Sequence, residues 1–190
     1  MSSIRLIRQL KENRLRVFTT QDAATLLEKS SGATCQLLRR LAKEKLVVNL
    51  KRGVWANLLA AELRLEEALP LLTHPWTSYV SLYSALSEHG LITEIPAQIY
   101  AVTGGRPGRL KTPLGSIRLH HIPPPTIWGF EMRKSPGSFP LATPEKAYLD
   151  FVYLASVPRS PIRMPVFRHT PRWDRARLKE YLKKWPVLNC

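Results

Sequence analysis

Apolar side chains recur at helical spacing near the start of the chain. Ile4, Ile7 and Leu10 follow one another at three-residue intervals with basic residues between them, which predicts an amphipathic helix from Ser3 to about Arg14. The sixteen prolines all lie at residue 70 or later. Because proline ends helices and interrupts strand ladders, the pattern predicts helices before residue 70 and shorter elements after it.

The next helix is predicted to begin after Thr19. This threonine is a suitable N-cap, and Asp22 three residues later gives the spacing of a capping box. The helix is expected to end at the turn Ser30-Ser31-Gly32. Within that turn, Ser31 is the expected cap of a third helix from Ala33 to about Lys45.

The third helix has two different faces. At about 100° per residue, Leu37, Leu38 and Leu41 gather on one side. The opposite side is polar and basic and carries Gln36, Arg39 and Lys43, with Arg40 at its edge. In a major groove, arginine can pair with guanine and glutamine with adenine, while lysine and the helix N-terminus contact phosphates.

A hairpin is predicted directly after this helix. Two β-prone runs, residues 46–50 and 54–56, flank the tight basic turn Lys51-Arg52-Gly53. A hairpin in this position is a wing, whose basic tip meets backbone phosphates. The order of elements therefore predicts a winged helix-turn-helix that binds double-stranded DNA. The expected DNA-contacting residues are Ser31, Thr34, Gln36, Arg39, Arg40, Lys43, Lys51 and Arg52.

Net charge favours the nucleic-acid interpretation. The chain has 29 lysines and arginines against 14 acidic residues, a formal net charge of +15. Such an excess is typical of proteins with a polyanionic partner, either nucleic acid or an anionic membrane surface. A protein-binding domain whose basic residues form a solvated face is the alternative.

Targeting signals and metal-ligating cysteines are not evident. No stretch approaches the roughly 18 apolar residues that span a bilayer, and Arg5 and Arg8 interrupt the segment where a signal peptide would be apolar. Two cysteines, Cys35 and Cys190, are too few for a disulfide framework or a zinc site. We therefore expect a cytoplasmic protein with reduced thiols, without a membrane partner, a metal or a cofactor.

Charge and composition divide the chain into two basic units. Residues 1–60 have a net charge of +8, residues 61–75 of −2 and residues 76–190 of +9. The segment from about Asn57 to Leu72 is rich in leucine, alanine and glutamate, which predicts a connecting helix that Pro70 and Pro75 stop. The expected domains are a winged helix over residues 1–57, a connecting helix over 58–75 and a mixed α/β domain over 76–190.

The second unit is predicted to contain a small, mainly antiparallel sheet, so that the whole chain is α+β. A helix is expected over Tyr79–Leu91, followed by strands over Gln98–Thr103 and Ile117–Ile122. The loop between the strands, Gly104–Gly115, is basic. Its residues Arg106, Arg109 and Lys111 are candidates for contacts with a phosphate backbone or an acidic partner.

Helix caps predict two further helices. Thr143 is a natural N-cap, Pro144 suits the first helical position, and Glu145 complements the helix dipole. Asp174 is the expected cap of a basic helix that continues to Trp185.

No catalytic activity is predicted. His120 and His121 are adjacent in a predicted strand, so they point to opposite faces and cannot chelate one ion. The glycine-rich segment 104–108 lacks the Gly-Lys-Ser/Thr ending of a phosphate-binding loop and is interpreted as a hairpin loop. A nuclease is a third hypothesis, which no metal-ligand spacing supports; its scattered acids would be Glu94, Glu131, Glu145 and Asp150.

An ordered set of short motifs resembles a known family. The set consists of Gly53-Val54-Trp55, Ser78-Tyr79-Val80-Ser81-Leu82, Ala85-Leu86, His89-Gly90-Leu91, and Thr143-Pro144-Glu145-Lys146-Ala147 with Leu149-Asp150. Over about residues 15–155, it is similar to the AbiEi-type antitoxins of type IV toxin–antitoxin systems, which act in abortive phage infection. The chain departs from that pattern after Tyr153, where prolines interrupt it.

The resemblance implies a bacterial or mobile-element protein with an N-terminal winged helix and an α/β antitoxin domain. It also implies repression of its own operon at an inverted repeat in the upstream DNA, and antagonism of a cognate nucleotidyltransferase toxin. A standalone winged-helix regulator, whose C-terminal domain dimerises or senses a ligand, is the alternative. An adjacent nucleotidyltransferase reading frame would distinguish the two.

Overall fold

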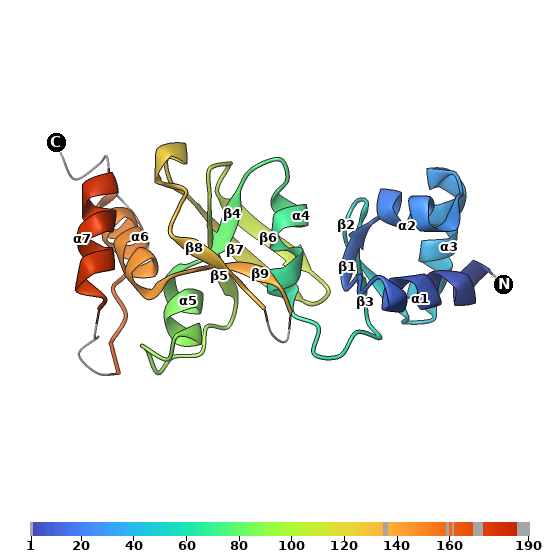
Figure 1. Cartoon of the computed structure of the whole chain (residues 1–190), viewed down its shortest axis with the longest axis horizontal. Coiled ribbons are helices and arrows are strands. Elements are labelled where there is room, and N and C mark those ends of the chain that lie inside the picture. Colours follow the sequence, from blue (N-terminus) through green and yellow to red (C-terminus); the bar gives the residue numbers. More distant parts are fainter. Residues whose placement is uncertain (1, 135–136, 159, 161, 169–172, 186–190) are drawn as a thin grey trace.

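The computed structural model describes residues 2–134, 137–158, 160, 162–168 and 173–185. The chain forms two units that lie end to end, with helices α1 to α3 at one end and α6 and α7 at the other (Figure 1). The N-terminal unit follows the predicted order of helix, helix, turn, helix and hairpin, with one further short strand. Its elements are α1 (Ser2–Glu12), β1 (Val17–Thr19), α2 (Thr20–Leu27), α3 (Ser31–Lys43), β2 (Val47–Lys51) and β3 (Val54–Asn57).

Side-chain caps fix the ends of α2 and α3. The capping box predicted for α2 is confirmed, because the Asp22 amide donates to Thr19 Oγ1 at 3.1 Å and the Thr19 amide donates to Asp22 Oδ2 at 2.7 Å. The cap predicted for α3 was placed one residue too late. The hydroxyl of Ser30 accepts from the Ala33 amide at 3.3 Å, so Ser31 is already helical and α3 ends at Lys43.

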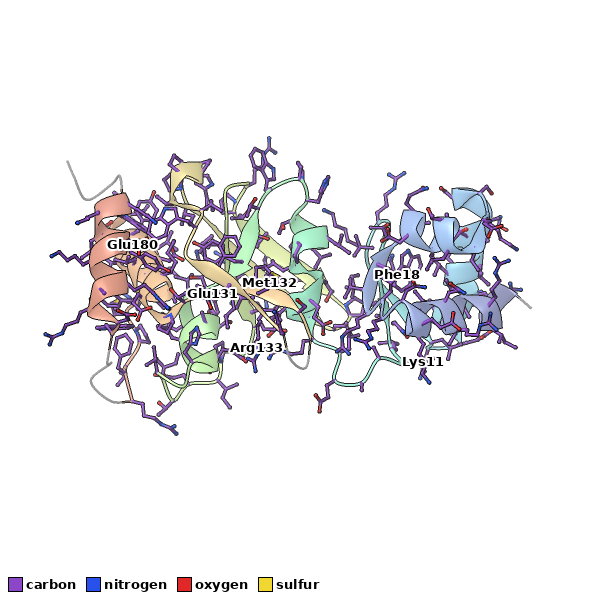
Figure 2. All side chains as sticks on the ribbon, viewed as in Figure 1. Lys11, Phe18, Glu131, Met132, Arg133 and Glu180 are labelled. Atoms are coloured by element: carbon purple, nitrogen blue, oxygen red, sulfur yellow. The ribbon has the colours of Figure 1, made fainter. Side chains whose placement is uncertain are left out.

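The small sheet has the strand order β1-β3-β2, with both pairings antiparallel. One of its faces packs against the three helices, where Phe18 and Trp55 are buried with the leucines of α1 and α3. Figure 2 shows Phe18 between the sheet and these helices. The short strand β1 did not appear in the sequence-based prediction. It pairs with β3 over Val17–Thr19, and Phe18 at its centre is completely buried.

The other face of the small sheet belongs to the core of the second unit. Leu50, Val54 and Ala56 project from β2 and β3 into that core, where they join Leu69 and Leu72. The small sheet therefore lies between two hydrophobic cores, and α3 is on the side away from the second unit (Figure 1).

The prediction of a connecting helix over residues 58–75 is mostly wrong. Residues 58–64 are not helical, and only the 3-10 turn η1 (Leu65–Ala68) and the short helix α4 (Leu69–Thr73) form. The Asn57 side chain accepts from the Leu59 amide at 3.0 Å, which stabilises a turn in place of a helix start. Pro70 occupies the first turn of α4, where no amide hydrogen is needed, so it starts this helix and does not stop it.

The second unit is built on a six-stranded sheet with the order β6-β7-β5-β4-β9-β8. The pairs β4–β5, β6–β7 and β8–β9 are antiparallel, while β5–β7 and β4–β9 are parallel. The predicted α+β class with a mainly antiparallel sheet is confirmed. The strands are β4 (Ser78–Val80), β5 (Ile99–Thr103), β6 (Gly108–Thr112), β7 (Gly115–His121), β8 (Phe130–Arg133) and β9 (Phe139–Ala142).

Two boundaries in this unit differ from the sequence-based prediction. Tyr79 and Val80 begin no helix, because they pair with β5 and Val80 also pairs with β9, and α5 is confined to Leu82–Glu88. The segment Gly104–Gly115 is not a simple loop. It contains the edge strand β6, which forms a hairpin with β7. The first error arises because pairing partners far along the chain decide whether a short segment becomes a strand. The second is a local hairpin that the sequence-based prediction missed, since β6 and β7 meet across a tight turn between Thr112 and Gly115.

Helices α6 (Pro144–Ser156) and α7 (Arg175–Lys184) form as the caps predict. Thr143 accepts from the Lys146 amide at 3.3 Å, and Asp174 accepts from the Ala176 and Arg177 amides, each at 3.0 Å. The two helices lie side by side at the end of the molecule away from α3 (Figure 1). In the part of the chain that the structure describes, no helix has the length and apolar character needed to cross a membrane.

Candidate nucleic-acid interface

The two predicted faces of α3 are present in the structure. Leu37, Leu38 and Leu41 are buried against the N-terminal sheet and helices. The polar and basic residues project into solvent; they are Gln36, Arg39, Arg40 and Lys43. These four side chains define what we call the α3 face. They present two guanidinium groups, one amide and one ammonium from two successive turns of one helix, which is the donor set that major-groove recognition uses.

Two further predicted contacts on α3 have different positions. Ser31 is exposed at the N-terminus, where its hydroxyl donates to Gln21 Oε1 at 3.1 Å. Thr34 was predicted to contact DNA, but this is wrong because its side chain is 0% exposed. Its spacing of three, four and seven residues from the three leucines places it on the apolar side of the helix. Its hydroxyl has no hydrogen-bond partner among the described residues.

The hairpin β2–β3 turns through two residues, Arg52 and Gly53. Asn49 donates from Nδ2 to the Lys51 and Val54 carbonyl oxygens, at 2.9 and 3.2 Å, across a register shift in the ladder. Gly53 has a φ of +80°, a conformation that favours glycine, and its carbonyl accepts from the Thr20 amide at 2.9 Å. The tip is therefore tied to the start of α2.

The two basic residues at this end of the hairpin, Lys51 at the end of β2 and Arg52 in the turn, do not have equal roles. The Lys51 ammonium was expected to face DNA, but it donates to the Leu72 carbonyl oxygen of α4 at 3.1 Å. This carbonyl is near the C-terminal end of α4, where the helix dipole favours a cation. The structure therefore places the Lys51 charge at the junction of the two units. Arg52 is exposed at the tip and stays a candidate for phosphate contact.

A second contact also joins the units. Arg16 donates from Nε and Nη2 to the two Glu67 carboxylate oxygens, at 2.6 and 3.0 Å, and from Nη2 to the Glu62 carbonyl oxygen at 2.9 Å. The hydrogen bond to Glu67 raises the pKa of Arg16 above its ordinary value. Since the Glu67 side chain is almost fully buried, this bidentate pair fixes the orientation of the N-terminal unit on the second unit.

The predicted basic residues of the second unit are on its edge hairpin. Arg106 is exposed in the turn before β6, and Arg109 and Lys111 lie on one face of β6 because residues two apart share a face. Sequence analysis missed Arg118, which is the Cα partner of Arg109 on β7. The alternation of polar and apolar residues in β7 was the signal that could have found it.

The second unit also contains a buried ionic cluster that sequence analysis missed. Lys146 and Asp150 are both 0% exposed and form an ion pair across one turn of α6. Asp150 Oδ2 also accepts from the Ser81 hydroxyl at 2.7 Å and from the Tyr79 hydroxyl at 3.2 Å. The signal in the sequence was the four-residue spacing of a lysine and an aspartate in an otherwise apolar helix.

Burial dominates the electrostatics of this cluster. It raises the pKa of Asp150 and lowers that of Lys146, while their mutual attraction opposes both shifts. Burial and the Asp150 carboxylate together raise the pKa of Tyr79 well above its ordinary value. The Lys146 ammonium lies over the rings of Trp185 at 4.7 Å, Trp128 at 5.0 Å and Tyr79 at 5.3 Å. The enclosure by aromatic rings indicates a structural role for this cluster.

The acids of the nuclease hypothesis do not converge. Glu145 Oε1 accepts from the Asp174 amide at 3.0 Å, whereas Asp150 belongs to the Lys146 cluster. Among the residues that the structure describes, no three histidines, cysteines, aspartates or glutamates form a group that could hold a metal ion. His120 and His121 point to opposite faces of β7, since His120 is buried and His121 is exposed.

Comparisons with known proteins identify no family for this chain. No family model matches the chain, and no curated protein matches it. Among solved structures, it is similar to the RV2827C protein from Mycobacterium tuberculosis, with 20% sequence identity and a TM-score of 0.45. The match covers 64% of this chain and 45% of that chain, so the chain spans less than half of that protein's length.

Proposed function

We propose that this protein binds operator DNA in the cytoplasm through the α3 face and the β2–β3 hairpin, and that it represses transcription of its own operon. The observation that carries the proposal is the α3 face itself. Its four polar side chains are exposed on a helix whose opposite side is buried, and a hairpin with an exposed arginine follows directly. An α-helix fits the major groove of duplex DNA, and this set of side chains can read base edges there.

The junction between the units supports this function indirectly. Because α3 packs on one face of the small sheet and the second unit packs on the other, the α3 face and Arg52 are held in a fixed relation. A pre-organised surface loses less conformational entropy when it binds a rigid duplex. The net charge of +15 adds a favourable, salt-dependent attraction to the phosphate backbone.

The role of the second unit follows from the family resemblance. We propose that this unit antagonises a cognate nucleotidyltransferase toxin, which makes the protein the antitoxin of a type IV system. The exposed arginines and lysine of the β6–β7 hairpin are candidates for contact with that toxin or with DNA. A standalone regulator without a toxin partner is the alternative.

Two experiments test the two halves of the proposal separately. Nuclease footprinting on the DNA upstream of the protein's own gene should give a protected inverted repeat, and a footprint indistinguishable from that on unrelated DNA would contradict operator binding. Co-expression with a neighbouring nucleotidyltransferase should restore growth that the enzyme alone arrests. Persistent arrest would refute the antitoxin role and leave the DNA-binding half intact.

A further inference from the structure

A groove lies between the β5–β7 part of the six-stranded sheet and Tyr83 of α5, near the β6–β7 edge. It consists of two adjoining cavities of about 270 and 320 Å³, which share Tyr83, Gln98 and Tyr100. The first cavity is completed by Arg118, His120 and Ile162. The second opens toward Arg109 and Glu94. The groove is separate from the α3 face, which lies at the far end of the other unit (Figure 1).

Flat aromatic rings form one wall of this groove. The rings of Tyr83 and Tyr100 meet edge to face with centroids 4.9 Å apart. The imidazole of His120 is stacked on Tyr100 at 6.1 Å with an interplanar angle of 13°. A wall of this kind accepts a planar, unsaturated ligand by stacking or edge contact.

Two buried polar atoms in the groove have no hydrogen-bond partner among the described residues. They are Gln98 Oε1 and His120 Nε2. Gln98 is oriented by its other amide atom, which donates to the Tyr100 hydroxyl at 3.2 Å. His120 is only 9% exposed, and burial with the nearby Arg118 lowers its pKa to about 4, so the ring is neutral at pH 7. Gln98 and His120 thus bring a buried amide oxygen and a buried imidazole nitrogen to the lining of the groove, both able to hydrogen-bond to a bound ligand.

Two guanidinium groups border the groove. Arg109 and Arg118 are paired across β6 and β7, and neither forms an ion pair with any residue in the described ranges. The Arg109 guanidinium donates to Ser116 Oγ at 3.3 Å, which keeps it on this side of the hairpin. Paired, uncompensated arginines are suited to a phosphate group.

We propose that this groove binds a single nucleotide, with the base against Tyr100 and Tyr83 and the phosphate on Arg109 and Arg118. Gln98 Oε1 accepts from an exocyclic amine or ring N–H of the base, and His120 Nε2 makes a second hydrogen bond. The nucleotide can be a free mononucleotide or one unpaired nucleotide of a single strand, since the two share this chemistry.

Calorimetric titration of the full chain tests the proposal. The probes are the four ribonucleoside monophosphates, inorganic phosphate, and an eight-nucleotide single strand of the preferred base. At least one monophosphate or the single strand should bind. A monophosphate that binds as tightly as the strand identifies a free nucleotide as the ligand, and a strand that binds at least tenfold more tightly identifies an unpaired nucleotide.

Two variants connect any binding to the groove. R118A and Q98A should each weaken nucleotide binding at least tenfold, while R175A, which removes an exposed arginine of α7, should bind like the parent. Binding that is unchanged in both groove variants would overturn the proposal. Inorganic phosphate that binds as tightly as every nucleotide, or no binding of any probe at 1 mM, would overturn it too. Duplex binding by R118A, measured in parallel, separates this proposal from the function assigned to α3.

Discussion

Helices α3 and α6 have the same length of 13 residues but use their charged residues in opposite ways. In α3, Arg39, Arg40 and Lys43 are all exposed, and the buried side holds leucines and one threonine. In α6, Lys146 and Asp150 are completely buried. Charged residues on a helix are therefore found in two different environments in this molecule. They form an exposed basic face in the N-terminal unit, and a solvent-excluded ionic cluster in the second unit.

The largest effect is expected from breaking the ionic cluster of α6. The single variant K146M leaves the Asp150 carboxylate buried without its counter-ion, which should lower the free energy of unfolding by about 3–5 kcal/mol. Urea denaturation followed by circular dichroism measures the loss. The double variant K146M/D150N removes both charges and keeps an acceptor for Ser81 and Tyr79, so it should recover at least half of that loss. A double variant less stable than K146M would show that the charges are not coupled.

The junction between the units should be the next most sensitive position. R16A leaves the nearly buried Glu67 carboxylate without its bidentate partner, with an expected loss of about 2 kcal/mol. Limited proteolysis should at the same time cut faster within residues 58–64. R8A is the matched control, because its ion pair with Glu12 is exposed on α1 and should contribute at most about 0.5 kcal/mol. Equal losses in the two variants would mean that the junction is not held by Arg16.

The pH dependence of the free energy of unfolding tests the burial of His120 in the second unit. Its pKa is about 4 in the folded chain and about 6.5 in the unfolded chain, so the unfolded state binds the proton first as the pH falls. The neutral ring's contribution to the free energy of unfolding is therefore fully present above pH 6.5. As the pH falls toward 4, this contribution decreases by about 2 kcal/mol.

The variant H120Q should remove that part of the acid destabilisation in urea titrations at pH 7 and pH 4.5. The exposed neighbour provides the control, and H121Q should retain the loss seen in the parent. The assignment would fail if the parent and H120Q lost the same stability between the two pH values.

The smallest effect is expected on the buried side of α3. T34V replaces an unpartnered, buried hydroxyl by a methyl group of similar size, and should stabilise the fold by up to about 1 kcal/mol. DNA affinity should not change, because Thr34 does not reach the surface. A tenfold loss of DNA affinity in a T34V protein of unchanged stability would restore Thr34 to the DNA-contacting set.

The sequence predicts the helices of the N-terminal unit well because the residues that specify each helix lie close together in the chain. The apolar spacing of Leu37, Leu38 and Leu41 and the capping box at Thr19 depend on residues at most a few positions apart. The α3 face followed directly from that spacing. The burial of Thr34 was also readable, since it lies on the same side as the leucines.

The remaining features depend on contacts between distant parts of the chain. Lys51 points to α4 because the second unit packs on the back of the small sheet, and no local pattern reports that packing. Tyr79 is extended because it pairs with Val102 of β5, which comes more than twenty residues later in the chain. The groove at Tyr100 and His120 is likewise assembled from several segments between Tyr83 and Ile162, so only its individual residues could be read from the sequence.

The central claim, that the α3 face reads DNA, is tested most directly by one affinity comparison. A duplex selected by the parent protein from a random library is labelled, and its binding is measured by fluorescence anisotropy at several salt concentrations. R39A should bind it about tenfold or more weakly while binding a scrambled duplex like the parent, and R52A should weaken both and lower the salt dependence. R175A, at the opposite end of the molecule, should match the parent on both duplexes. An R39A protein that binds the selected duplex as tightly as the parent would contradict the account.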